Sequence, residues 1–102
     1  MKIMVINYRS ANHPFEVTGH ECVVCDLKSA LMTLVAEEPD VILAFVEYCD
    51  EEENLALLED VKRSMLNSTK FTRLGFMEDR KIEGERYLQF PYSEEQFQQA
   101  LS

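Results

Sequence analysis

Two cysteines three positions apart are the residues of this sequence whose spacing most suggests chemistry. Cys22 and Cys25 have the Cys-x-x-Cys spacing of redox-active thiol pairs, and His13 and His20 could complete a set of four zinc ligands with them. Redox-active pairs lie at the start of a helix, whereas residues 21–25 read as a strand. Positions three apart on a strand face opposite sides of the sheet. We therefore expect structural thiols here, and neither a redox pair nor a zinc site.

Few other residues could do chemistry. Cys49 precedes the acidic run 50–53, and negative neighbours disfavour its thiolate form. Glu47 follows an apolar run and could act as an isolated ligand, although a solvated carboxylate at the end of a strand is the more ordinary interpretation. The sequence shows no glycine-rich phosphate loop, no Ser/His/Asp arrangement and no pair of carboxylates at a strand end. We therefore expect no enzyme activity, no bound metal and no cofactor.

Length and composition indicate a single domain spanning residues 1–102, with 46% hydrophobic and 28% charged residues. The net charge of -9 repels phosphate backbones and anionic lipids, so we expect this domain alone to bind neither nucleic acid nor a membrane. The apolar run 3–6 is too short for a signal peptide. Three cysteines without a secretion signal indicate reduced thiols in the cytoplasm.

Five short apolar runs predict the strands. They are rich in Ile, Val, Leu and Phe, which is typical of strands buried on both faces of a parallel sheet. The runs span residues 2–8, 21–25, 41–46, 71–77 and 87–90, the fourth being the weakest.

Helical spacing and capping residues predict three helices between or after these strands. The first spans 27–38 after an N-cap at Asp26, with one apolar stripe formed by Leu27, Ala30, Leu31, Leu34 and Val35. A second helix follows a capping box of Asp50 and Glu53 and turns inward Leu57, Leu58, Val61 and Met65. A last short helix follows a capping box of Ser93 and Gln96.

The order of these elements predicts an α/β fold. Alternating strands and helices favour an open parallel sheet, and five strands fit the flavodoxin-like order 2-1-3-4-5. The helix complement is reduced, because residues 9–19 and 78–86 leave room for little more than a turn. Parallel crossovers usually need a dozen or more residues, so an antiparallel hairpin over 71–90 is the alternative.

Two stretches of this chain resemble the receiver domains of response regulators. Gly-His-Glu-Cys-Val-Val at 19–24, a helix, and then Pro-Asp-Val-Ile-Leu at 39–43 follow the family's usual run into its third strand. Tyr-Leu-Gln-Phe-Pro-Tyr-Ser at 87–93 is similar to the Lys-Pro-Phe motif that closes the family's fifth strand. The resemblance implies a receiver-like fold whose first and fourth helices are shortened.

The residues that receivers use for phosphotransfer are replaced. The family's acidic pair after strand one falls on Asn7 and Tyr8, and its phosphorylated aspartate falls on Phe45. The strand-four hydroxyl falls near Gly75, and the lysine before the proline is Phe90. A phosphoryl group needs a nucleophile, a divalent ion held by oxygens, and nearby cations. These positions supply none of them, so we interpret the chain as a degenerate, non-phosphorylatable receiver.

The aromatic replacements suggest a hypothesis about the former site. Phe45 and Phe90 would converge where the acidic pocket normally lies and fill it with apolar side chains. The alternative is that they are two unrelated phenylalanines of the core. A carboxylate introduced at Phe45 would then be costly if the position is buried.

The shortened helices lead us to expect uncovered apolar sheet surface, which monomers seldom leave exposed to water. A homodimer or a regulatory partner domain would cover it. The resemblance places such contacts around strand five and the last helix, which here means Tyr87, Tyr92, Phe97 and Leu101. Phe97 and Leu101 could instead pack inward.

These observations predict a signalling domain that works by protein contact without phosphate control. It could be free-standing or part of a larger regulator such as a transcription activator. The alternative is a small-molecule or thiol redox sensor on the same fold, which would use Cys22, Cys25 or a pocket beside Phe45.

Overall fold

The structure is a computed structural model that describes residues 1–7, 19–45, 52–75, 85–89 and 92–101. Its strands are β1 (Lys2–Ile6), β2 (Glu21–Cys25), β3 (Val41–Phe45), β4 (Lys70–Gly75) and β5 (Arg86–Gln89). Its helices are α1 (Ala30–Glu37), α2 (Glu52–Ser64) and α3 (Glu94–Ala100). All five predicted strands and all three predicted helices are therefore present.

The strands form one parallel sheet in the order β2-β1-β3-β4-β5. This confirms the predicted α/β architecture with a flavodoxin-like arrangement. β5 pairs parallel to β4, with Arg86 opposite Thr72 and Gln89 opposite Gly75. The hairpin alternative for residues 71–90 is therefore wrong.

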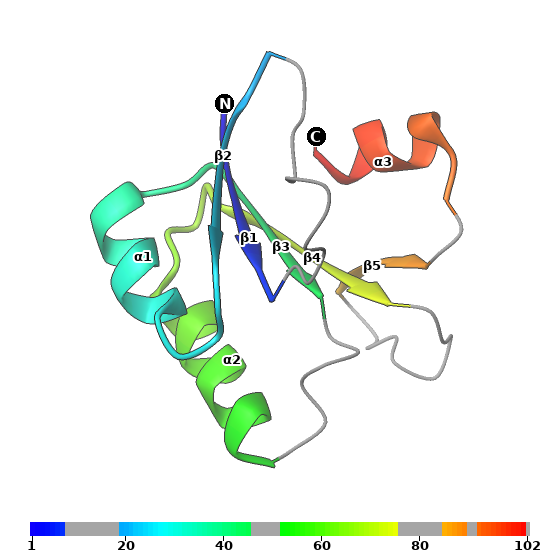
Figure 1. Ribbon diagram of the computed structural model, residues 1–102. Coiled ribbons are helices and arrows are strands. Elements are labelled where there is room, and N and C mark those ends of the chain that lie inside the picture. The colour runs from blue at the N-terminus through cyan, green and yellow to red at the C-terminus, as the bar shows by residue number, and fades with distance from the viewer. Residues whose placement is uncertain (8–18, 46–51, 76–84, 90–91, 102) are drawn as a thin grey trace.

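Helices cover the two faces of the sheet unequally. α1 and α2 lie on one face, which we call the two-helix face, and α3 lies on the other, the α3 face (Figure 1). Side chains alternate between the two faces along each strand. Met4 and Ile6 therefore pack in the apolar cluster on the two-helix face, which we call the two-helix cluster. Ile3 and Val5 pack in the apolar cluster on the α3 face, the α3 cluster. The sheet thus divides the apolar core into two clusters.

The central strands are buried on both faces. Ile3, Val5, Leu43 and Leu74 all lie on the α3 face, and all are fully buried. The expectation of uncovered apolar surface on the sheet is therefore wrong for β1, β3 and β4. The large exposed apolar side chains among the described residues lie elsewhere, at the N-terminus, on the edge strand, on α1 and α2 and in the connection after α2: Met1, Val24, Leu31, Met32, Val35, Leu55 and Leu66.

Helix α1 differs from its predicted form at its start and along one side. It begins at Ala30, and Ser29 occupies its N-cap position without a side-chain cap. Asp26 still acts in the way predicted for a cap, because its Oδ1 accepts a 2.8 Å hydrogen bond from the Ser29 amide. That bond closes a turn over residues 27–29 instead of the first turn of the helix.

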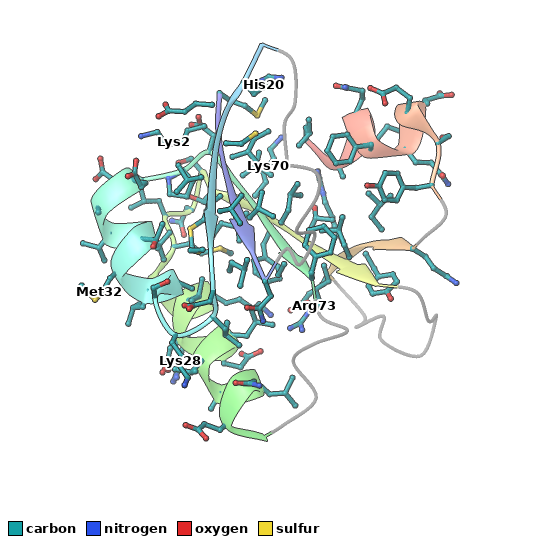
Figure 2. The ribbon with its side chains drawn as sticks, viewed as in Figure 1. Lys2, His20, Lys28, Met32, Lys70 and Arg73 are labelled. Carbon is teal, nitrogen blue, oxygen red and sulfur yellow. The ribbon has the colours of Figure 1, made fainter. Side chains whose placement is uncertain are left out.

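Only part of the predicted apolar stripe of α1 faces the sheet. Ala30 and Leu34 are buried, but Leu31 is 40% exposed and Val35 71% exposed. Each residue advances about 100° around a helix, so positions 31 and 35 share a side that the sheet does not cover. Met32 also points away from the sheet (Figure 2) and is 78% exposed.

The other two helices follow their predicted faces and caps. Leu58 and Val61 of α2 are buried, and Leu57 and Met65 pack partly buried against the same cluster. At α3, Ser93 Oγ accepts from the Gln96 amide and the Gln96 side chain accepts from the Ser93 amide, which confirms the capping box. Asp50 lies outside the described residues.

Candidate interaction surface

The strand register brings three of the predicted receiver positions together at the carboxyl ends of adjacent strands. Ile6 pairs with Ala44, so Asn7 and Phe45 follow at the carboxyl ends of adjacent strands. Phe45 pairs with Leu74, and Gly75 comes next on β4. Ligands of open α/β sheets bind outside the carboxyl ends of strands. Tyr8 and Phe90, the other two predicted positions, lie outside the described residues, as do His13, Glu47 and Cys49.

Asn7 links the end of β1 to the end of β2. It is buried and adopts a left-handed backbone conformation with φ of 61°, which asparagine tolerates better than most residues. Its amide donates to the Cys25 carbonyl (2.9 Å), and its Oδ1 accepts from the Leu27 amide (3.0 Å). The side chain at the position that the sequence resemblance aligns with a receiver acid is thus used to close the turn that precedes α1.

Phe45 and Gly75 offer no side-chain oxygen ligand at the carboxyl ends of their strands. Phe45 is buried in the α3 cluster together with Leu43, Leu74 and Phe97. Gly75 ends β4 and has no side chain. The hypothesis that Phe45 and Phe90 together fill the former pocket stays a prediction, because Phe90 is not described.

The four predicted contact residues do not form one surface. Phe97 and Leu101 are buried in the α3 cluster, so the inward-packing alternative is correct for both. Tyr92 is partly buried and stacks on Phe97, with ring centroids 5.7 Å apart and an interplanar angle of 16°. Tyr87 packs against the two-helix cluster, on the opposite face from Tyr92.

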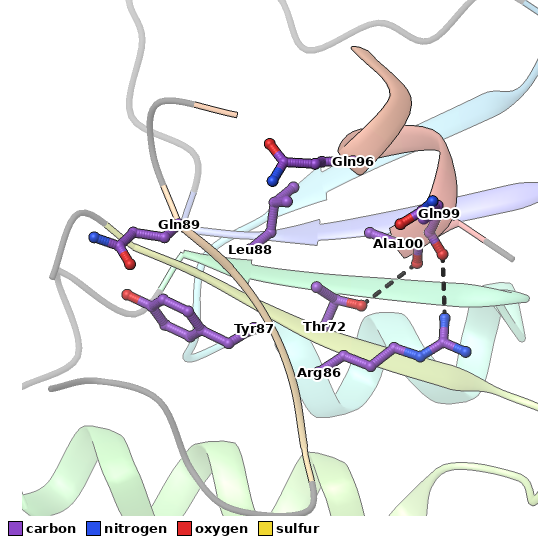
Figure 3. Close-up of a pocket in the computed structure, with 8 residues that line it drawn as sticks. All are labelled: Thr72, Arg86, Tyr87, Leu88, Gln89, Gln96, Gln99 and Ala100. Atoms are coloured by element: carbon purple, nitrogen blue, oxygen red, sulfur yellow. Dashed lines mark hydrogen bonds between the residues drawn. The ribbon is translucent and has the colours of Figure 1, made fainter. Parts of the chain in front are cut away.

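An open cavity of about 470 Å³ lies between β5 and α3. Figure 3 shows the residues along it: Gln96 and Gln99 come from α3 and Leu88 of β5 points toward α3, whereas the side chains of Tyr87 and Gln89 point to the other side of β5. Carboxamides each offer donors and an acceptor. The lining is therefore suited to polar groups, including the amides of a peptide chain. Sequence reasoning found Tyr87 but missed the glutamines, whose recurrence over 89–99 was the available signal.

Two side chains beneath this cavity hold the end of α3 against the sheet. The buried Thr72 hydroxyl donates to the Ala100 carbonyl and Arg86 donates to the Gln99 carbonyl, both at 3.4 Å (Figure 3). The last carbonyls of a helix have no partner within the helix. The two bonds supply such partners and so fix the position of α3 over β4 and β5.

A group of charges around the buried Arg73, on the two-helix face, was not predicted. Arg73 of β4 is only 4% exposed and pairs with Glu85, and Lys62 of α2 pairs with the same carboxylate. Glu59 Oε1 lies 3.7 Å from the nearest nitrogen of each cation. Both cations also lie 5.6 Å from the ring centroid of Phe71. An arginine inside an apolar strand run was the signal, because a buried cation needs carboxylate partners.

The two described cysteines lie on opposite faces of the sheet, as their spacing predicted. Cys22 packs against the α3 cluster and Cys25 against the two-helix cluster, and both thiols are free. Burial raises the pKa of the Cys25 thiol, although a hydrogen bond with Thr33 partly opposes this. The positions do not allow a Cys22–Cys25 disulfide, and Cys25 has little thiolate character.

Within the described ranges, no three His, Cys, Asp or Glu side chains are grouped as a metal site would require. No helix among them is both long and apolar enough to cross a membrane. In comparisons with known proteins, no family model, no curated protein and no solved structure matches the chain.

Proposed function

We propose that this chain is a cytoplasmic, receiver-like signalling domain that receives no phosphoryl group, catalyses no reaction and acts by binding another regulatory protein. The observation that carries the proposal is the pair Asn7 and Phe45 at the carboxyl ends of β1 and β3. In a receiver these places hold an Mg²⁺ ligand and the phosphorylated aspartate.

The chemistry of the two side chains supports the first half of the proposal. Asn7 Oδ1 is already bonded to the Leu27 amide, and an aromatic ring at Phe45 offers neither a nucleophile nor an oxygen ligand. Acceptance of a phosphoryl group requires both, with cations to neutralise the developing charge.

The cavity between β5 and α3 supports the second half. Its walls carry the carboxamides of Gln96 and Gln99 beside the apolar side chain of Leu88, and so offer hydrogen bonds together with apolar contact area, a combination common in protein interfaces. The bonds from Thr72 and Arg86 to the end of α3 keep these walls in place. Thiol sensing by a Cys22–Cys25 pair is disfavoured, because the two lie on opposite faces of the sheet.

Intact-mass spectrometry after incubation with acetyl phosphate and Mg²⁺ tests the first half. We expect no phosphoryl adduct on this chain, while a conventional receiver in the same mixture is modified. An adduct that hydroxylamine removes, as it removes acyl phosphates, would overturn the proposal.

Site-specific photo-crosslinking tests the second half. A photoreactive side chain at Gln99, in the cavity, should give one discrete adduct, whereas one at Gln98, which bonds to Glu94 on the exposed side of α3, should not. The partner so identified should then bind the Gln99→Arg variant at least about tenfold more weakly than the Gln98→Arg variant in calorimetry. Equal affinities for the two variants would rule out this surface.

A further inference from the structure

The outer side of β2 is an exposed edge of the sheet. β2 is the end strand and pairs with β1 without a bulge from Glu21 to Cys25. In the part of the chain that the structure describes, no strand lies on its other side. The strand reads Glu-Cys-Val-Val-Cys and so lacks the proline, lysine or bulge with which proteins commonly protect such an edge.

The backbone bonds at the two ends of β2 show which groups face outward. The Glu21 amide donates to the Met1 carbonyl, and the Cys25 carbonyl accepts from the Asn7 amide. Residues 21 and 25 thus turn their backbone groups toward β1. Backbone groups alternate in direction along a strand, so Cys22 and Val24 direct their N–H and C=O groups to the outer edge.

The side chains at this edge are apolar and only partly covered. Val24 is 47% exposed, whereas Val5, its register partner on β1, is fully buried. Cys22 and Val23 are half-buried. A further strand beside β2 would therefore cover apolar surface that the sheet now leaves in contact with water.

The distribution of charge favours one kind of neighbour in one direction. A net charge of -9 opposes contact between two copies over most surfaces, but positions 22–25 carry no charge. Glu21 lies 3.9 Å from the Lys2 ammonium, which also pairs with Glu37 at 2.9 Å and so offsets part of the Glu21 charge. His20, whose Nδ1 lies 3.2 Å from the N-terminal ammonium, precedes the strand, and the carboxylate of Asp26 follows it. Two antiparallel copies would place each His20 beside the other copy's Asp26, whereas parallel copies would place the two Asp26 carboxylates together.

We propose that two copies of this chain pair β2 against β2 in antiparallel fashion, about a two-fold axis at Val23. Cys22 of the first copy exchanges N–H···O bonds with Val24 of the second copy. Val24 of the first copy does the same with Cys22 of the second copy. The two Val23 side chains face each other on the two-helix face. The contact joins two five-stranded sheets into one, and because it is isologous it closes at two copies.

This dimer goes beyond the proposed function and uses the opposite edge of the sheet from the cavity beside β5. The two proposals can therefore fail separately. The strand spans only 5 residues, so the interface is small and the dimer is a weak one whose population rises with concentration.

Sedimentation velocity from about 10 µM to about 1 mM tests the dimer. The 11.9 kDa chain should move toward twice that mass as concentration rises. Val24→Pro removes the outward N–H and leaves the bonds to β1 intact, since proline is tolerated at the exposed side of an edge strand. The substitution deletes two intermolecular bonds per dimer, so the dissociation constant should rise at least about tenfold.

Val24→Thr is the matched control, because it keeps the N–H group and the branched side chain and should keep the dimer. Circular dichroism melts establish that each variant is folded. Val24→Lys, which adds a charge at an exposed position, replaces the proline variant if that variant is unfolded, and it too should be monomeric. A wild-type chain that stays monomeric at the highest concentration would overturn the proposal. So would a Val24→Lys variant that dimerises as strongly as the wild type.

Amide hydrogen exchange locates the contact. The N–H groups of Cys22 and Val24 should exchange more slowly at high than at low concentration, while that of Glu21, already bonded to Met1, should change little. Concentration-dependent protection confined to other strands would place association elsewhere and overturn the β2 assignment.

Discussion

The Oδ1 atom of Asn7 accepts a 3.0 Å hydrogen bond from the backbone amide of Leu27. This bond joins the end of β1 to the turn before α1, and it occurs in a residue whose φ of 61° most side chains avoid. A position that resembles a receiver's metal-binding acid thus has a structural task in this chain.

Asn7→Ala should lower the free energy of unfolding by about 2–4 kcal/mol, because it leaves the buried Leu27 amide without its acceptor and puts alanine in a left-handed conformation. Asn7→Asp keeps an acceptor oxygen and tolerates that conformation, so it should cost less than Asn7→Ala even though its carboxylate is buried. Urea denaturation of the two variants measures the difference. Equal losses would show that the hydrogen bond does not stabilise the turn.

Phe45→Asp should be strongly destabilising, because Phe45 is buried among apolar side chains of the α3 cluster. A buried polar group without a partner costs several kcal/mol, on the order of 2–7. Phe45→Leu preserves the apolar contact and should cost less than about 1.5 kcal/mol. Calorimetry that found the aspartate variant as stable as the leucine variant would argue against an apolar site.

Glu85→Gln should destabilise the fold by about 3–5 kcal/mol, because it removes the carboxylate that pairs with both Lys62 and the buried Arg73. Glu53→Gln on the exposed surface of α2 serves as the control and should stay within about 0.5 kcal/mol of wild type. The measurement is the urea midpoint. Similar midpoints for both variants would mean that the cluster contributes little.

The carboxyl group of Asp26 should titrate below its ordinary pKa of 3.8, because it accepts hydrogen bonds from the Ser29 hydroxyl and amide. A lowered pKa means that the carboxylate stabilises the fold above the ordinary value. The contribution is lost as the pH falls through the lowered pKa.

Ser29→Ala removes the hydroxyl donor and keeps the amide, so the Asp26 pKa should rise part of the way toward the ordinary value. Carbon-13 NMR titration of the carboxyl group in both proteins measures the change. An unchanged midpoint would assign the shift to some other cause.

The strands could be predicted from the sequence because burial on both faces leaves a nearly continuous apolar run, as in residues 41–45. Two capping residues marked the start of α3 equally clearly. These signals are local, and the alternation of strands with helices then favours one order of a parallel sheet.

The features that were predicted wrongly or not at all from the sequence depend on residues distant along the chain. Leu31 and Val35 have helical spacing with Leu34, but which side of α1 is covered depends on where α2 and the sheet lie. Arg73 is buried with partners 12 and 14 positions away, Glu85 and Glu59, and no local pattern links the three. The cavity beside Gln96 and Gln99 exists only because α3 docks against β5.

The division of the apolar core by the sheet has a consequence for redesign. Leu58 belongs to the two-helix cluster and Leu101 to the α3 cluster, and the layers beside a sheet lie about 10 Å from it. At such separations the effects of substitutions on stability are usually additive. Each of the two apolar clusters can therefore be repacked on its own, and a loss of stability in one cluster can be compensated by a gain of stability in the other.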